Sequence, residues 1–265
     1  MRQAGKDATP LSDAYDVYDP AANQWTAGRL AVPHDQASAV VVGDQAFFAG
    51  GSTNAPADAD PNAALPATDV VEVYDAATGK WSVAHLSVPR RAIVAVPAAG
   101  RFALFAGGFS ANPDGAAYDV YDTVLHTWTS GQLGAVLYTF VDAPVGIATV
   151  GDLTFLSVED AVDVFDAASG QWSSHALRGS GGGQALTVGH KVLFGEGSLL
   201  DVYDADTGQW SIARLRGENG NGYAGVTVGG RAVYVTRPRH GEYRPSGGDW
   251  VIIGRPYVDV LAPAS

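Results

Sequence analysis

The sequence contains no cysteine among its 265 residues. This absence excludes disulfides, thiolate metal ligands and cysteine nucleophiles. Lysine is scarce as well, with three residues (Lys6, Lys80 and Lys191), and the formal net charge is −12. Nucleic acids and anionic membranes bind surfaces with clustered Lys and Arg, so we expect neither as a partner.

Long hydrophobic runs are also missing. No stretch approaches the roughly 18 apolar residues of a membrane span, and the polar start of the chain lacks the apolar core of a signal peptide. These features predict a soluble protein, cytoplasmic by default. Helical periodicity of useful length is absent too, and this favours an all-β fold.

What the sequence does contain is a repeated motif. Five times, Val-Tyr-Asp or Val-Phe-Asp is followed by a tryptophan six positions after the aspartate, at Trp25, Trp81, Trp128, Trp172 and Trp210. A fixed internal spacing that recurs at a period of roughly 40 to 50 residues predicts stacked supersecondary units.

Each repeat also contains two short apolar runs joined by a glycine turn, such as residues 39–42 and 46–49 around Gly43. Short runs rich in Val, Phe and Tyr between Gly and Asp turns are typical of strands joined as hairpins. We therefore expect third and fourth strands around each motif, and first and second strands near residues 36–49, 92–106, 145–158, 184–196 and 223–236.

Double glycines end the second strand of the first two repeats, at Gly50-Gly51 and Gly107-Gly108, ahead of Val-Tyr-Asp and Trp. This arrangement resembles the kelch repeat of β-propellers, and the resemblance covers nearly the whole chain. It implies a single all-β domain over residues 1–265 with a kelch-like β-propeller fold. Kelch propellers serve many roles, so the resemblance does not specify a function.

The ends of the chain leave the number of blades open. The first motif, near Trp25, precedes the first apolar pair, and no motif follows the last pair in register. We expect five four-stranded blades, with the N-terminal strands around residues 15–25 completing the last one. Residues 257–261 look like a further third strand, so six blades and a fragment of a longer array are the alternatives.

The regular residues of the repeat are expected to be structural. Evenly spaced tyrosines and tryptophans predict packing between blades rather than a ligand platform. The last aspartate of each motif is expected to bind nearby backbone amides in a turn. These residues are Asp19, Asp75, Asp122, Asp166 and Asp204.

Residues that differ between repeats mark the candidate site. The resemblance implies that the connections into the first and third strands share one face, around the mouth of a central channel. Counting back from the first turns puts His34, Arg91 and Asp142 at matching positions. The predicted binding residues combine these with neighbours and with residues at the double-glycine positions: His34, Arg90, Arg91, Tyr138, Asp142, Glu196, Tyr223 and Arg237.

A varied rim on a rigid scaffold favours a binding module, which presents its loop-rich face to a protein segment or a small-molecule ligand. One alternative is a carbohydrate-active enzyme of the isomerase or oxidase type. A structural repeat segment of a larger protein is the second alternative.

No catalytic residue, metal site or cofactor is predicted. Asp58, Asp60 and Asn62 have the alternating spacing of a calcium loop. However, Ala63 stands where such a loop needs glycine, and Pro61 interrupts the run, so a solvated acidic loop is expected.

Overall fold

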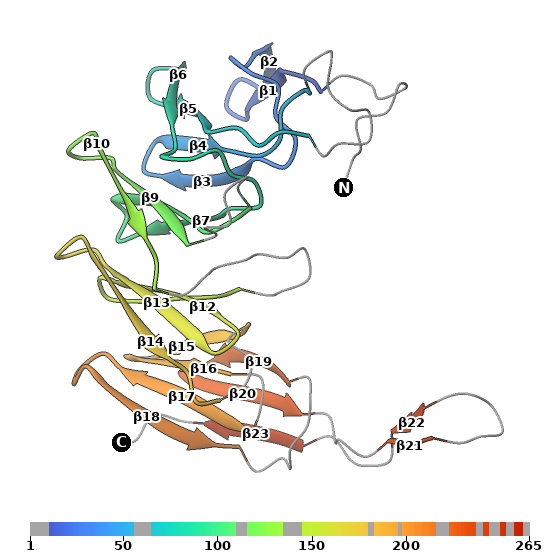
Figure 1. Cartoon of the computed structure of the whole chain (residues 1–265), viewed down its shortest axis with the longest axis vertical. Helices are drawn as coiled ribbons and strands as arrows, with labels where there is room; N and C mark the ends of the chain where they lie inside the picture. Colours follow the sequence, from blue (N-terminus) through green and yellow to red (C-terminus); the bar gives the residue numbers. More distant parts are fainter. Residues whose placement is uncertain are drawn as a thin grey trace. The chain divides into compact units, whose positions relative to one another are not determined.

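The computed structural model describes residues 11–55, 65–109, 116–134, 145–179, 183–195, 198–215, 223–236, 241–243, 250–252 and 257–261, with the backbone alone for 223, 224 and 236–261. Twenty-three β-strands account for the regular structure in these ranges, which confirms the all-β fold (Figure 1). This part of the chain contains no helix that could cross a membrane. The chain divides into two compact units, Met1–Val141 and Asp142–Ser265.

The first unit begins with a two-stranded antiparallel sheet of β1 (Ala14–Asp19) and β2 (Gln24–Arg29). A four-stranded meander follows, in the order β3-β4-β5-β6. Its strands are Ser38–Val42, Gln45–Ala49, Val70–Asp75 and Lys80–His85. A two-residue turn at Gly43-Asp44 joins β3 to β4, and Gly43 has the positive φ (57°) that this hairpin turn requires.

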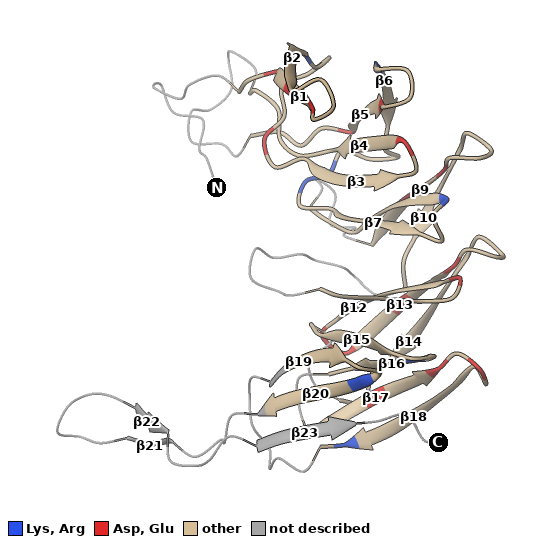
Figure 2. Cartoon of the chain, turned by 180° about the vertical axis from the view of Figure 1, so that it is seen from behind, with Lys and Arg blue, Asp and Glu red and all other residues tan. Residues whose placement is uncertain are grey.

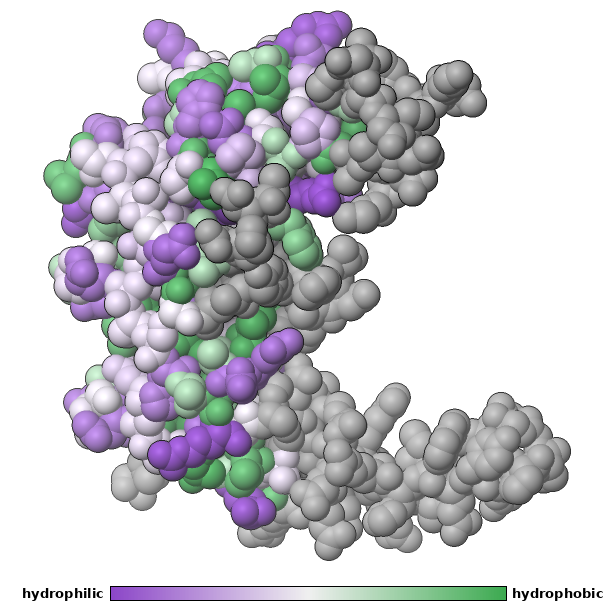
Figure 3. All heavy atoms as spheres, in the orientation of Figure 1, coloured by the Kyte–Doolittle hydropathy of each residue, from purple (hydrophilic) through white to green (hydrophobic). Residues whose placement is uncertain are grey.

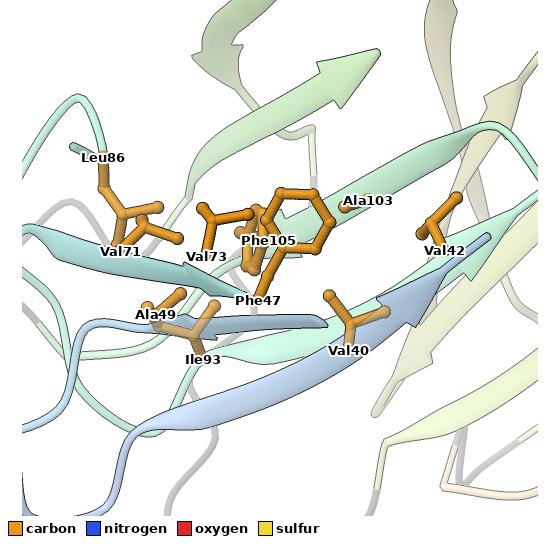
Figure 4. Close-up of a cluster of buried hydrophobic side chains, with 10 residues drawn as sticks. All are labelled: Val40, Val42, Phe47, Ala49, Val71, Val73, Leu86, Ile93, Ala103 and Phe105. Carbon is orange, nitrogen blue, oxygen red and sulfur yellow. The ribbon is translucent and has the colours of Figure 1, made fainter. Parts of the chain in front are cut away.

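The second sheet of this unit repeats the meander with β7 to β10. Its strands are Val94–Ala98, Phe102–Ala106, Ala117–Asp122 and Thr127–Gln132. The two sheets face each other and share a core that includes Val40, Phe47, Ala103 and Phe105 (Figure 4). Each sheet therefore buries apolar surface that it could not bury alone.

The second unit contains two further four-stranded meanders. One consists of β11 (Gly146–Val150), β12 (Leu153–Val158), β13 (Ala161–Asp166) and β14 (Gln171–Ala176). The next consists of β15 (Ala185–Val188), β16 (Lys191–Phe194), β17 (Leu199–Asp204) and β18 (Gln209–Arg214). The four meanders thus contain four of the five expected pairs of first and second strands, and all five motif hairpins are present.

The last sheet corrects the expected role of the N-terminal strands. β19 (Tyr223–Val228) pairs with β20 (Arg231–Thr236), and the other edge of β20 pairs with β23 (Tyr257–Leu261). The position that we assigned to the N-terminal hairpin is therefore held by residues 257–261, whose alternating apolar pattern matches a third strand. A short hairpin of β21 (Gly241–Tyr243) and β22 (Trp250–Ile252) lies between β20 and β23 in sequence.

The last aspartate of each motif is a turn residue, as predicted. Asp75 accepts hydrogen bonds from the N–H and hydroxyl of Thr78, and each of the other four aspartates accepts the backbone N–H of the residue two positions later. Figure 2 shows such acidic residues in red, for example at the turn after β17. At Asp122 a hydrogen bond from Arg101 holds the pKa at about 2.

Repeated aromatic residues pack between sheets, as predicted, at Tyr121, whose ring lies 5.3 Å from that of Phe47, and at Tyr203 and Trp210, whose rings lie 5.1 and 6.5 Å from that of Phe155. Trp128 lies against Phe105, with ring centroids 5.8 Å apart, and against Tyr121 at 5.0 Å. Trp25 is 69% exposed, although it occupies the same position of the repeat and contacts Tyr18. The motif therefore produces a packed tryptophan where a neighbouring sheet is available to cover it.

This difference predicts unequal losses of stability. Trp128→Ala removes ring contacts with Phe105 and Tyr121 at the core that the two sheets share, and it is expected to lower the free energy of unfolding by about 3 kcal/mol. Trp25→Ala, the matched control, is expected to cost less than about 1 kcal/mol because the side chain is already exposed. Urea denaturation of both variants measures the two losses, and equal losses would contradict the packing described here.

Candidate functional site

Three of the eight predicted binding residues have described side chains: His34, Arg90 and Arg91. All three lie in the connections that lead into first strands, between β2 and β3 or between β6 and β7. Tyr223 begins β19, where the backbone alone is described. Tyr138, Asp142, Glu196 and Arg237 lie outside the described residues.

His34 is a buried residue whose side chain is only 5% exposed. Its Nδ1 lies 2.8 Å from the carbonyl oxygen of Gly50, so this nitrogen carries the proton and donates. The Nε2 atom faces Glu72 Oε1 at 3.9 Å, and Glu72 is itself buried. Glu72 Oε1 also accepts the backbone N–H groups of Ala31 (2.7 Å) and Val32 (3.2 Å).

Arg90 forms the same kind of cluster in the next sheet, and it is fully buried. Its guanidinium donates to the carbonyl oxygens of Gly107 (2.7 Å) and Ala117 (2.6 Å) and forms an ion pair with Asp119. Asp119 also accepts the backbone N–H of Ser87 at 2.9 Å. Burial lowers the pKa of Arg90, and the charge of Asp119 opposes this shift.

The two clusters are equivalent, which corrects the expected match of His34 with Arg91. His34 and Arg90 each bind the first glycine carbonyl of a double glycine and face the acid of the third strand. The count from the first turns was wrong by one residue because the turn between β7 and β8 has three residues (99–101), whereas the turn between β3 and β4 has two. Arg90 therefore holds the connection in place and has no guanidinium free for a ligand.

The double glycine is needed because connections pass directly over it. A Cβ atom at Gly50 (φ 62°) would lie 2.3 Å from the carbonyl oxygen of Arg90, and one at Gly51 (φ 90°) would lie 2.5 Å from that of Asp35. Gly51 N–H also donates to the Arg90 carbonyl at 2.9 Å. The glycines thus bring the backbones of His34 and Arg90 together at this end of the first two sheets.

The sequence analysis missed the buried acid at the third position of each third strand. The residue is buried in all four meanders, as Glu72, Asp119, Asp163 and Asp201. Asp201 accepts the backbone N–H groups of residues 178 and 179 at 2.9 and 2.8 Å, and Asp163 accepts the hydroxyl of Ser174. The available signal was an acid between apolar residues in the middle of a strand, where an unpaired charge is costly.

Arg91 differs from Arg90 in burial and in its partners. It is partly exposed, and its Nη1 donates to the carbonyl oxygen of Leu65 at 3.2 Å. The backbone of Arg91 forms a β-bridge with Phe109, which lies in the connection that follows β8. This bridge fixes the position of Arg91. Among the described side chains, no carboxylate forms an ion pair with Arg91.

The described surface carries little continuous hydrophobic area in the view of Figure 3, where green patches are small and separated by polar residues. Within the described ranges, no group of three His, Asp or Glu side chains is placed to hold a metal ion. The acidic run at Asp58, Asp60 and Asn62 lies outside them.

Comparison with known proteins adds no assignment. No family model matches the chain, and a search of curated proteins finds no match either. The kelch resemblance therefore rests on the repeat itself.

The buried cluster around Arg90 predicts a large difference between adjacent arginines. Arg90→Met leaves Asp119 buried without its ion-pair partner, and we expect a loss of about 3 to 5 kcal/mol in the free energy of unfolding. Arg91→Met, the matched control, is expected to cost less than about 1 kcal/mol. Denaturant titration of the two variants measures this, and a similar cost for both would show that the ion pair does not hold the connection.

Proposed function

We propose that the chain is a binding module in which the four-stranded sheets are blades of a kelch-like β-propeller. The ligand, a protein segment or a small molecule with a carboxylate, lies on the face formed by the connections into the first and third strands. The repeat spacing, the double glycines and the four meanders support the blade assignment.

The face is supported by the buried clusters beneath it. His34 and Arg90 fix the backbones of two successive connections. The neighbouring connections are joined to them by β-bridges between Asp35 and Ser52 and between Arg91 and Phe109. Rigid loops lose little conformational freedom on binding, so such a face is suited to recognition.

Arg91 is the observation that carries the proposal. This residue is partly exposed, and its guanidinium donates to the Leu65 carbonyl and forms no ion pair with a described carboxylate, on a chain whose net charge is −12. Guanidinium groups bind carboxylates through paired N–H···O bonds, and this geometry selects an acidic ligand. An acidic ligand also needs such a local positive site to overcome repulsion by the rest of the protein.

Selection of short random peptides on the intact chain tests this function. We expect the enriched peptides to share Asp or Glu and to bind Arg91→Ala about tenfold more weakly or worse, because a charge-assisted hydrogen bond is lost. Arg101→Ala is the matched control, since Arg101 belongs to the same sheet but lies at the turn between β7 and β8. Enrichment of peptides without acids, or equal binding by both variants, would contradict the proposal.

A further inference from the structure

Aromatic side chains of successive sheets fit together in a repeated arrangement. In the second unit, Phe194, Tyr203 and Trp210 of one sheet form a socket around Phe155 of the preceding sheet. The ring centroid of Phe155 lies 5.5, 5.1 and 6.5 Å from those of Phe194, Tyr203 and Trp210. Phe155 comes from the second strand of its sheet, β12.

The first unit contains a second filled socket. Phe47, which occupies the same register position on β4 as Phe155 on β12, lies 5.3 Å from Tyr121 and 6.2 Å from Phe105. Trp128 completes this socket by stacking on Phe105. In both cases an aromatic residue of a second strand enters the aromatic cluster of the following sheet.

A third socket of the same composition is open. Phe48, Tyr74 and Trp81 line a groove of about 470 Å³ together with residues of β1. Trp81 lies 5.8 Å from Phe48 and 5.1 Å from Tyr74, close to the 5.6 and 5.1 Å at Trp210 in the filled socket. The open socket thus has the geometry of a filled one, with Tyr15 covering part of Trp81 at 4.6 Å.

The socket is open because β1 lacks a neighbour in the part of the chain that is described. β5, β9, β13 and β17 each pair with a second strand, but β1 pairs with β2 alone. β20 cannot supply the missing strand, because β19 and β23 occupy both of its edges.

The free edge of β1 has defined hydrogen-bonding groups. Leu30 N–H donates to the Asp13 carbonyl, so residues 13, 15, 17 and 19 face β2. The N–H and C=O groups of residues 16 and 18 and the C=O group of residue 14 therefore point to the free edge, while the Ala14 N–H donates to Ser12 Oγ at 3.1 Å. These residues also line the groove, so edge and socket form one continuous surface.

The charge at this edge also differs from the equivalent positions. Asp16 occupies the place of the buried acids Glu72, Asp119 and Asp201, yet it is exposed and has no described partner. In the complete sheets, this acid pairs with a residue of the second strand. That residue is the next one along the chain after the aromatic residue at the Phe155 position. An added strand would therefore place an aromatic side chain opposite Val17 and the next side chain opposite Asp16.

We infer that β1 and the open socket form a docking site for an extended segment of a partner protein. The segment adds to the sheet as an antiparallel strand, places an aromatic residue among Phe48, Tyr74 and Trp81, and places a Lys or Arg directly after it opposite Asp16. Backbone pairing, aromatic burial and an opposite-charge pair across the strands then act together. This surface is separate from the loop face and does not depend on the function proposed for it.

A peptide from the chain's own sequence serves as the probe. It carries residues 151–159 with Leu156→Lys, so that Phe155 and the new lysine stand in the inferred positions. We expect saturable binding to the full-length protein in fluorescence anisotropy, with slower hydrogen exchange at the amides of residues 16 and 18. The same peptide with Phe155→Ala is expected to bind at least about tenfold more weakly.

Charge reversal provides the second arm. Asp16→Lys should weaken binding of the lysine peptide and strengthen binding of a Leu156→Glu peptide, and because Asp16 is exposed this variant is expected to fold. Asp44→Lys, which changes an exposed turn acid of the same unit, is the matched control and should do neither.

The inference would be overturned if binding changed neither with the Phe155→Ala peptide nor with the charge reversal at Asp16. Strong protection of residues 16 and 18 without peptide would also overturn it, because another segment of the same chain would then occupy the edge.

Discussion

The structure depends on a carboxylate buried in the third strand of each of the four meanders. In three sheets this group, at Glu72, Asp119 or Asp201, accepts backbone N–H groups of the connection that enters the same sheet. Moving that connection would leave a buried charge without hydrogen bonds, which is costly. The interaction thus ties the first strand of a sheet to its third strand and sets where the loops of the face begin.

The strands and their order could be predicted from the sequence, because the spacing of Tyr, Asp and Trp repeats without change. The site could be predicted less well. Its residues were matched by counting from turns, and the three-residue turn at 99–101 shifted Arg90 out of register. The two acids of each Asp-Val-Tyr-Asp motif also look alike in sequence, although one caps a turn and the other lies inside the sheet. The pairing of β20 with β23 was open for a related reason, since both ends of the chain offered a suitable strand.

Both proposed interactions arise where the repeat is interrupted. Arg91 stands beside a buried equivalent of His34 but keeps a partly exposed guanidinium. Asp16 belongs to a repeat position that is buried in the four meanders, and Trp81 to one that is covered by the preceding sheet at Trp210, yet both border an open groove. At regular positions, charged groups are paired and apolar surface is buried within the fold. Groups that can bind a partner therefore remain where a neighbouring strand is missing.

Amide hydrogen exchange measured by NMR tests most directly whether the buried carboxylates hold the connections. The amides that bind them, such as those of Ala31, Ser87 and Gly179, lie in loops that would otherwise exchange quickly. The account predicts protection comparable to that of the neighbouring strands, and loss of this protection in Asp201→Ala at residues 178 and 179 but not at Ala31 or Ser87. Fast exchange at these amides in the unaltered protein would contradict it.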